Sequence, residues 1–159
     1  MIKAIISDFS KVLLFPKDKS YQGKLNALYR QLSQTPGYNI FQHFELNTEL
    51  LNLYSTLKDQ FALYMFTSDV IQDAPEVQLY IQSVFTKIFS ASKININKKD
   101  VAAYKKILAE LNLSGDEVVY IDDTSEYIQA ATQAGLHTIQ YINNEDLREK
   151  LSLKIQLPL

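Results

Sequence analysis

Acidic residues stand at the ends of two strand-like segments that lie far apart in the chain. The segment KAIISD ends in Asp8, and the segment EVVYIDD ends in Asp122 and Asp123. The sequence between them alternates helical and strand-like patterns, which would place the two ends side by side. Three carboxylates this close repel one another unless a cation lies among them or one of them takes up a proton. The pattern therefore predicts a metal site.

Five short apolar segments, of the kind found in strands buried on both faces, would carry these acids. We expect strands over residues 2–7, 61–66, 84–89, 118–121 and 137–142. Apolar residues at helical spacing fill the intervals, and we expect helices over residues 50–57, 73–82, 101–111 and 124–134. Asn47 or Thr48 would cap the first of them, and Gly135 would end the last. Alternating strands and helices predict an α/β fold, a mainly parallel sheet between two layers of helices.

The order of the strands decides whether the acids meet. If the first three strands run outward on one side and the fourth starts on the other side of the first, strands one and four are neighbours at the topological switch point. That crevice would hold Asp8 on one side and the pair Asp122 and Asp123 on the other. Thr67 and Ser68, at the end of strand two, would lie beside them. Open sheets bind ligands at such a crevice.

Two segments do not fit the alternation. Residues 14–46 contain Pro16 and one helical pattern at 25–32, and we expect a small cap-like insertion above the crevice of a single domain spanning residues 1–159. An insertion this short covers a site only in part, so we expect a fairly open site. The final LSLKIQLPL is apolar enough for either an added edge strand or a contact surface.

Composition excludes several classes of site and partner. There is no cysteine, which excludes disulfides and cysteine-ligated zinc, and the two histidines, His43 and His137, are too few for a multi-histidine metal centre. A net charge of −2 without a basic cluster argues against a nucleic-acid partner. No apolar run approaches the ~20 residues of a membrane span, and the chain does not open on a cleavable signal pattern. We therefore expect a cytoplasmic protein with no membrane partner.

Four motifs in order resemble those of the haloacid dehalogenase (HAD) superfamily of hydrolases. IISDFSKVL resembles the family's first motif, with Asp8 after an apolar strand, and YMFTSD resembles the second, with Thr67 in the hydroxyl position. FSASKININKKDVAAYKKIL is similar to the third region and puts Lys98 in the lysine role, with Lys93 and Lys99 as rivals. VVYIDDTSEYIQAATQAG is similar to the acidic fourth motif. Each motif alone also suits a turn, a helix cap or a surface lysine, but the joint order favours the family.

The resemblance implies a HAD-like Rossmannoid sheet with strand order 3-2-1-4-5 and a metal centre. Mg²⁺, a hard ion that prefers oxygen ligands, would be held by Asp8, Asp123 and the main-chain carbonyl of Ser10. Asp122 would help directly or through water. Asp8 would also be the nucleophile, forming an aspartyl-phosphate that divides one difficult displacement into two easier ones.

The resemblance also implies how a substrate would be bound. Thr67 and Ser68 would hydrogen-bond the phosphoryl oxygens, and Lys98 would offset negative charge on the phosphate and on the nucleophile. The substrate would be a small phosphorylated molecule or a phosphorylated macromolecule. The oligomeric state stays open.

Three residues depart from the family pattern. Ser10 stands where phosphatases of the family usually carry an aspartate that serves as general acid and base, a task worth about 10² to 10⁴ in rate. Lys11 replaces a common glycine, and Tyr127 stands where relatives often have asparagine. Two hypotheses follow: a slow or selective Mg²⁺-dependent phosphatase or phosphotransferase, or a non-catalytic relative that binds a phosphorylated ligand or a protein partner. A carbon–halogen hydrolase is a distant third.

Overall fold

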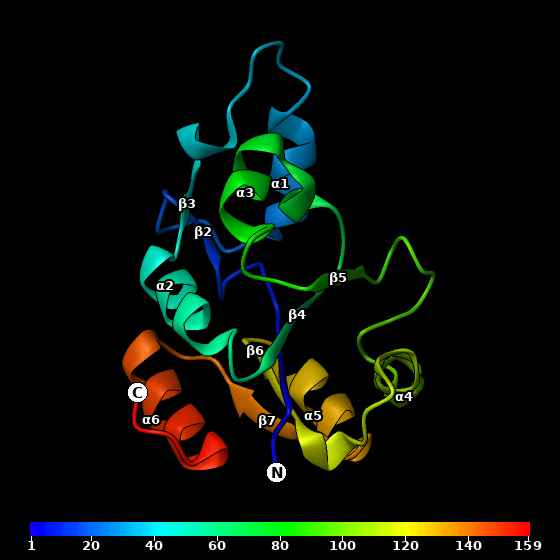
Figure 1. The fold of residues 1–159 in the computed structure, drawn as a ribbon. Helices are drawn as coiled ribbons and strands as arrows, with labels where there is room; N and C mark the ends of the chain where they lie inside the picture. The colour runs from blue at the N-terminus through cyan, green and yellow to red at the C-terminus, as the bar shows by residue number, and fades with distance from the viewer.

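The centre of the computed structural model, which describes residues 1–159, is a five-stranded sheet (Figure 1). The strands are β1 (Ala4–Ser7), β4 (Ala62–Thr67), β5 (Lys87–Ser90), β6 (Val118–Asp122) and β7 (His137–Gln140). Every neighbouring pair is parallel, and the order across the sheet is β5-β4-β1-β6-β7. In chain order this is 3-2-1-4-5, so the predicted sheet is confirmed, and β1 and β6 are neighbours.

Six helices connect and cover these strands. They are α1 (Leu25–Leu32), α2 (Thr48–Leu57), α3 (Pro75–Ile81), α4 (Val101–Leu111), α5 (Ser125–Gln133) and α6 (Asn144–Ile155). Asn47 caps α2, because its side-chain oxygen accepts a hydrogen bond from the amide of Leu50 at 3.2 Å. Gly135 follows α5 with a φ of +95°, the left-handed conformation expected of it there.

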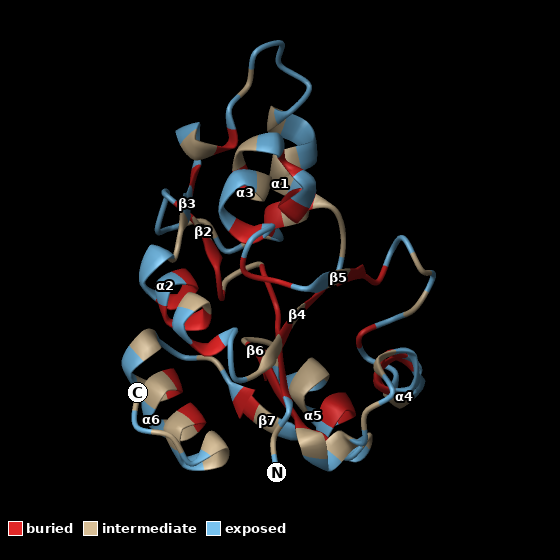
Figure 2. Cartoon of the chain, viewed as in Figure 1, coloured by how far each residue is buried: buried red, intermediate tan, exposed pale blue.

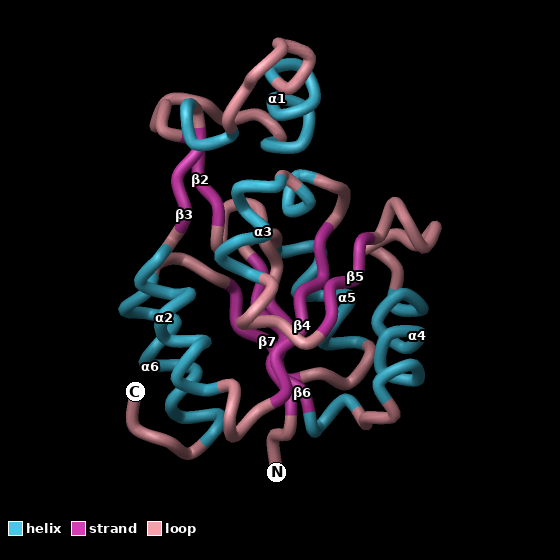
Figure 3. Tube along the Cα trace, turned by 45° about the horizontal axis from the view of Figure 1, so that its top comes forward, coloured by secondary structure: helices cyan, strands magenta, loops and turns pink.

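The two faces of the sheet pack against different helices, which gives three layers. Successive strand residues point to opposite faces. Ile5 therefore belongs to a core that includes buried residues of α2, α3 and α6, whereas Ile6 belongs to a second core with α4 and α5. Figure 2 shows the buried residues concentrated along the strands and on one side of the helices, and Figure 3 shows α2 and α6 across the sheet from α4. The strands are thus covered on both faces, as their apolar sequences predict.

The C-terminal segment LSLKIQLPL does not form the edge strand that was one of its two predicted alternatives. Residues 144–155 form α6, and Leu147 and Leu151 bury one side of it against the sheet, so an added edge strand is wrong. The chain then turns at Gln156, which has a φ of 56°. A signal for this helix was present in the sequence, since Asn143 is followed by Glu145 and Asp146 in the first turn. Only two buried leucines mark its inner face, which leaves a weak helical period.

Between β1 and α2 the chain leaves the sheet and returns. Two short antiparallel strands, β2 (Leu14–Pro16) and β3 (Phe44–Leu46), pair at its base, with α1 and the short helix η1 (Ile40–Gln42) between them. A side chain of α1 holds the loop after β4, because Asn26 Oδ1 accepts hydrogen bonds from the amides of Val70 (3.1 Å) and Ile71 (2.9 Å). None of the helices has the length and apolar content that crossing a membrane requires.

Candidate active site

The two acidic strand ends meet at one edge of the sheet. β1 and β6 are paired with Ser7 opposite Ile121, and the amide of Asp8 donates to the carbonyl oxygen of Ile121 at 2.8 Å. Asp122 ends β6, and Asp123 follows it. Each of the three acids has a carboxylate oxygen that lies within 4.8 Å of one from each of the others. The structure therefore brings together the three acids singled out from the sequence.

Lys98 lies among these acids, in the loop before α4. Its Nζ donates to Asp8 Oδ1 at 2.8 Å, to Asp122 Oδ2 at 2.7 Å and to the carbonyl oxygen of Phe66 at 3.0 Å. All three ammonium protons are thus used, and the side chain is 1% exposed. The two rival lysines point elsewhere: Lys93 pairs with Asp73 and Lys99 pairs with Glu126.

The oxygens of Asp122 are occupied by protein donors. Oδ2 accepts from Lys98 and from the hydroxyl of Tyr120, and Oδ1 accepts from the amide of Thr124 at 2.9 Å. Tyr120 was not singled out from the sequence, because a tyrosine within a buried strand is normally a core residue. Asp122 is therefore placed to hold Lys98.

Asp8 and Asp123 are the acids that can offer oxygens to a cation. Lys98 bonds only Oδ1 of Asp8 and leaves Oδ2 to other partners, and Asp123 accepts only a long bond, 3.3 Å, from the hydroxyl of Thr124. Carboxylate oxygens this close are the ligands that a hard divalent ion prefers. The donor set therefore fits Mg²⁺.

Burial and mutual repulsion shift the ionisation of the site. Burial, followed by the negative charge of Asp122, raises the pKa of Asp8 to about 7, although Lys98 opposes the shift. Burial and Asp122 also raise the pKa of Asp123, against the nearby positive charge of Lys11. Burial alone would lower the pKa of Lys98, but the charges of Asp8 and Asp122 outweigh it and raise that pKa. One cation among three acids leaves the site short of positive charge, which a divalent ion would supply.

Thr67 and Ser68 lie where predicted, at the end of β4 next to β1, but differ in exposure. Thr67 is buried and its hydroxyl donates to the carbonyl oxygen of Asp69 at 3.0 Å, whereas Ser68 is exposed. Asp69 was missed in the sequence. Its carbonyl also accepts from Ser90 at 2.7 Å, and its side chain pairs with Arg30 of α1. Asp69 thus connects Thr67, at the end of β4, to Arg30 of α1.

The loop after Asp8 has an unusual backbone. Lys11 has a φ of 62°, and its amide donates to the carbonyl oxygen of Leu14 at 2.8 Å. A residue with a Cβ pays a steric penalty in this left-handed region, whereas glycine does not. Lys11 makes no ion pair, and Ser10 beside it is half-buried.

The site is more enclosed than so short an insertion predicts. Asp8 is 5% exposed and Lys98 is 2% exposed, while Asp123 and Ser10 remain half-buried. The expectation of a fairly open site is therefore wrong at Asp8 itself. The loop that follows it is buried as well, at Phe9, Val12 and Leu13.

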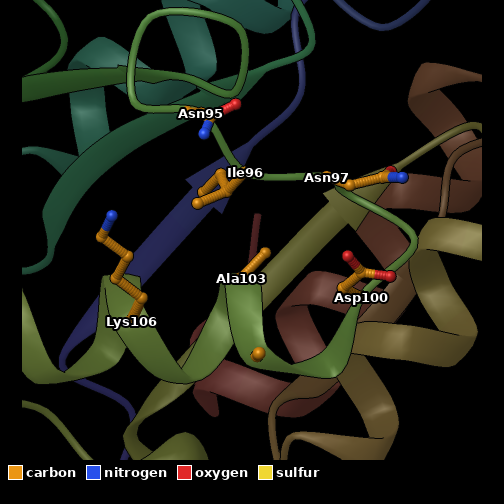
Figure 4. Close-up of a pocket in the computed structure, with 7 residues that line it drawn as sticks. Asn95, Ile96, Asn97, Asp100, Ala103 and Lys106 are labelled. Atoms are coloured by element: carbon orange, nitrogen blue, oxygen red, sulfur yellow. The ribbon is translucent and has the colours of Figure 1, made fainter.

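A separate hollow of about 370 Å³ lies between the loop before α4 and the first turns of that helix (Figure 4). Its lining comprises Asn95, Ile96, Asn97, Asp100, Ala102, Ala103 and Lys106. None of the three acids or Lys98 belongs to it. The hollow is therefore no part of the acidic site.

Comparison with known proteins agrees with this geometry. The family model of haloacid dehalogenase-like hydrolases matches residues 24–141. The chain belongs to this family. The matched range includes Thr67, Lys98 and the acidic pair but begins after Asp8, so the first motif rests on the geometry above.

Two curated relatives match only a part of this chain. Enolase-phosphatases E1 from Enterobacter sp. (strain 638) and Gluconobacter oxydans are 37% and 39% identical over 49 residues, 31% of this chain. The match spans only about a fifth of their length, 21% and 22%.

Solved structures of the family match the whole fold. A HAD family enzyme from Bacteroides thetaiotaomicron, in complex with magnesium and inorganic phosphate, has a TM-score of 0.69 at 14% identity, covering 94% of this chain and 99% of that one. A predicted HAD-like hydrolase from Porphyromonas gingivalis has a TM-score of 0.67 at 15% identity, covering 98% of both chains. These similarities show the fold.

Proposed function

We propose that the protein is a Mg²⁺-dependent phosphatase or phosphotransferase that acts through an aspartyl-phosphate on Asp8. The observation that carries this proposal is the position of Asp8, which is buried, bonded to Lys98 and within 4.8 Å of the other two acids. The family supports hydrolysis, and the Bacteroides thetaiotaomicron relative binds magnesium and phosphate.

The residues divide the work of phosphoryl transfer between them. An oxygen of Asp8 forms a bond to phosphorus as the bond from phosphorus to the leaving oxygen breaks, and water later cleaves the resulting acyl-phosphate. Lys98 offsets the negative charge on Asp8 and on the phosphoryl group, and Asp122 fixes the position of Lys98. Thr67 and Ser68 bind the phosphoryl oxygens, and the hydroxyl of Thr67 turns from the carbonyl oxygen of Asp69 to do so.

A metal ion at this site would be held by Asp8, Asp123 and the main-chain carbonyl of Ser10, with Asp122 reaching it through water. When bound, Mg²⁺ neutralises charge that one lysine cannot balance among three acids. Lys98 bonds only one oxygen of Asp8, and Asp123 accepts only a long bond from Thr124, which supports this division of ligands.

Ser10 limits the rate of the reaction. Its hydroxyl is too weak an acid to protonate a leaving group near neutral pH, and no other carboxylic acid besides the three described belongs to the cluster. We therefore expect slow turnover. The substrate would be a small phosphorylated molecule or a phosphorylated macromolecule whose leaving group can depart without a proton.

Turnover of an activated ester tests the proposal. Purified protein is assayed with para-nitrophenyl phosphate, with Mg²⁺ and then with a chelator, alongside Asp8→Asn and the exposed control Asp59→Asn. We expect Mg²⁺-dependent turnover that Asp8→Asn abolishes and Asp59→Asn retains. Equal rates for the parent and Asp8→Asn across a broad panel of esters would refute the proposal.

Ser10 and the strained Lys11 also favour a second candidate, a non-catalytic relative that binds a phosphorylated ligand or a protein partner. In this case inorganic phosphate would bind in the presence of Mg²⁺, with no turnover of any ester. Robust turnover that depends on Asp8 would remove this candidate.

A further inference from the structure

We propose that Tyr127 is a positioning residue, whose aromatic ring closes a cage around the ammonium group of Lys98 and so holds that charge against Asp8. The inference rests on the proposed function and concerns the same site. It assigns a task to the position where relatives often have asparagine.

Three rings from three elements surround Lys98 Nζ. The distances from Nζ to the ring centroids are 5.2 Å for Phe66 of β4, 5.7 Å for Tyr120 of β6 and 4.8 Å for Tyr127 of α5. All three lie within the ~6 Å at which a cation is attracted to the face of a ring. Tyr127 is the nearest of the three.

The three rings differ in burial. Phe66 and Tyr120 are fully buried within the sheet, and Tyr127 is half-buried on α5. Phe66 and Tyr120 are part of the hydrophobic core beneath the sheet, so their positions need no functional explanation. Tyr127 therefore forms the wall between Lys98 and solvent.

The hydrogen bonds of Lys98 explain why an aromatic wall suits this position. Its three protons already go to Asp8, Asp122 and the carbonyl of Phe66. An amide side chain in contact with the ammonium would offer an oxygen that competes for one of these protons. A ring attracts the cation through its face without taking a proton, so the three hydrogen bonds are left intact.

A second contact ties the same two segments together. Lys99, next to Lys98, pairs with Glu126, next to Tyr127, at 2.7 Å. The loop that carries Lys98 is thus joined to the first turn of α5 at two adjacent positions. Because that turn directly follows Asp123, the arrangement links the lysine to the acidic loop it serves.

Three substitutions of Tyr127 test the cage. Tyr127→Phe keeps the ring, whereas Tyr127→Leu and Tyr127→Asn remove it. We expect kcat with Mg²⁺ and para-nitrophenyl phosphate to stay within about twofold for Tyr127→Phe and to fall about 5- to 30-fold for the other two, with a smaller change in KM. An unchanged kcat in Tyr127→Leu would overturn the inference, and so would a Tyr127→Phe variant as slow as Tyr127→Leu.

A measurement without turnover separates this inference from the proposed function. In the parent and in Tyr127→Phe, the shielded ammonium of Lys98 should exchange its protons slowly enough to give a nitrogen-15 NMR signal, identified by its loss in Lys98→Met. The signal should vanish in Tyr127→Leu, provided thermal unfolding shows that variant to be folded. A folded Tyr127→Leu that keeps the signal would overturn the cage even if Asp8 proves to be the nucleophile. Conversely, inactivity of the parent enzyme would refute the proposed function and leave this test standing.

Discussion

The loop after β1 and the loop after β6 carry the acids of the same site, but they are built differently. After β6, Asp122 accepts bonds from Lys98, Tyr120 and the amide of Thr124, so its carboxylate is held from several sides. After β1, Lys98 is the one side chain that donates to the carboxylate of Asp8, and the chain passes through Lys11 with a φ of 62°. The loop after β6 thus fixes its acid with several hydrogen bonds, whereas the loop after β1 leaves its acid with fewer.

The difference separates two requirements of phosphoryl transfer. Charge neutralisation would depend on Lys98, which is bonded to Asp8 and Asp122. In the mechanism we propose, proton transfer would depend on the residue two positions after Asp8, and here that residue is Ser10. Under this proposal the site could hold a phosphoryl group but would be poorly equipped to move a proton.

Replacing Ser10 with an acid should remove the difference between the two loops, and we expect it to change the rate of turnover more than any other substitution. Ser10→Asp adds the missing acid and base, so turnover of esters with poor leaving groups should rise by about 10²- to 10⁴-fold. The measurement is kcat/KM for alkyl phosphates with Mg²⁺. Ser10→Asn is the matched control of similar size that cannot give up a proton. Equal rates for both variants would show that proton transfer does not limit the reaction.

Lys98→Met tests the hydrogen-bonded group formed by Lys98, Asp8 and Asp122. Removing one partner from a buried charged set leaves Asp8 and Asp122 uncompensated, so the free energy of unfolding of the metal-free protein should fall by about 3–5 kcal/mol. The exposed control Lys93→Met should cost less than about 1 kcal/mol. Urea denaturation above neutral pH measures both. Similar losses for the two variants would mean that Lys98 is an ordinary surface charge.

The pKa of Asp8 predicts how stability depends on pH. The folded value of about 7 lies above the ordinary value of 3.8, so the folded metal-free protein retains a proton that the unfolded chain loses. Stability should therefore decrease as pH rises from about 4 to about 7, and this decrease should be absent in Asp8→Asn. Urea denaturation at several pH values, with a chelator present, checks the prediction. If the free energy of unfolding decreases equally with pH in both proteins, groups other than Asp8 cause the decrease.

The smallest expected effect is at Lys11. Lys11→Gly relieves the left-handed strain and should raise the free energy of unfolding by about 1 kcal/mol. Lys11→Ala removes the same charge but keeps the strain, so it isolates the backbone effect. Equal stability of the two variants in thermal unfolding would show that charge, not backbone conformation, decides the cost.

Much of this arrangement could be predicted from the sequence because it depends on local patterns. Buried parallel strands are short apolar runs, and the acids and hydroxyls that follow them must share one edge of the sheet. That reasoning placed Asp8, Thr67 and the acidic pair before any coordinates. Lys98 needed the family resemblance, since Lys93 and Lys99 are equally plausible in a loop.

Other features depend on contacts that no local pattern records. Asp69 is bonded to Ser90 and paired with Arg30, residues distant in the chain, so only the folded structure shows its part. Asp8 is likewise buried and bonded to Lys98, a residue distant in the chain, and only the folded structure shows this. The helix α6 could not be predicted from apolar periodicity, because only Leu147 and Leu151 are buried along its length.

The central claim is that Asp8 accepts a phosphoryl group beside a divalent ion shared with Asp123. A crystal soaked with Mg²⁺ and beryllium fluoride, a mimic of the aspartyl-phosphate, tests it most directly. We predict density for a trifluoroberyllate group whose beryllium is bonded to an oxygen of Asp8, with an ion that contacts both Asp8 and Asp123. Carboxylates too far apart to share one ion, or an Asp8 with no beryllium bound, would contradict the account.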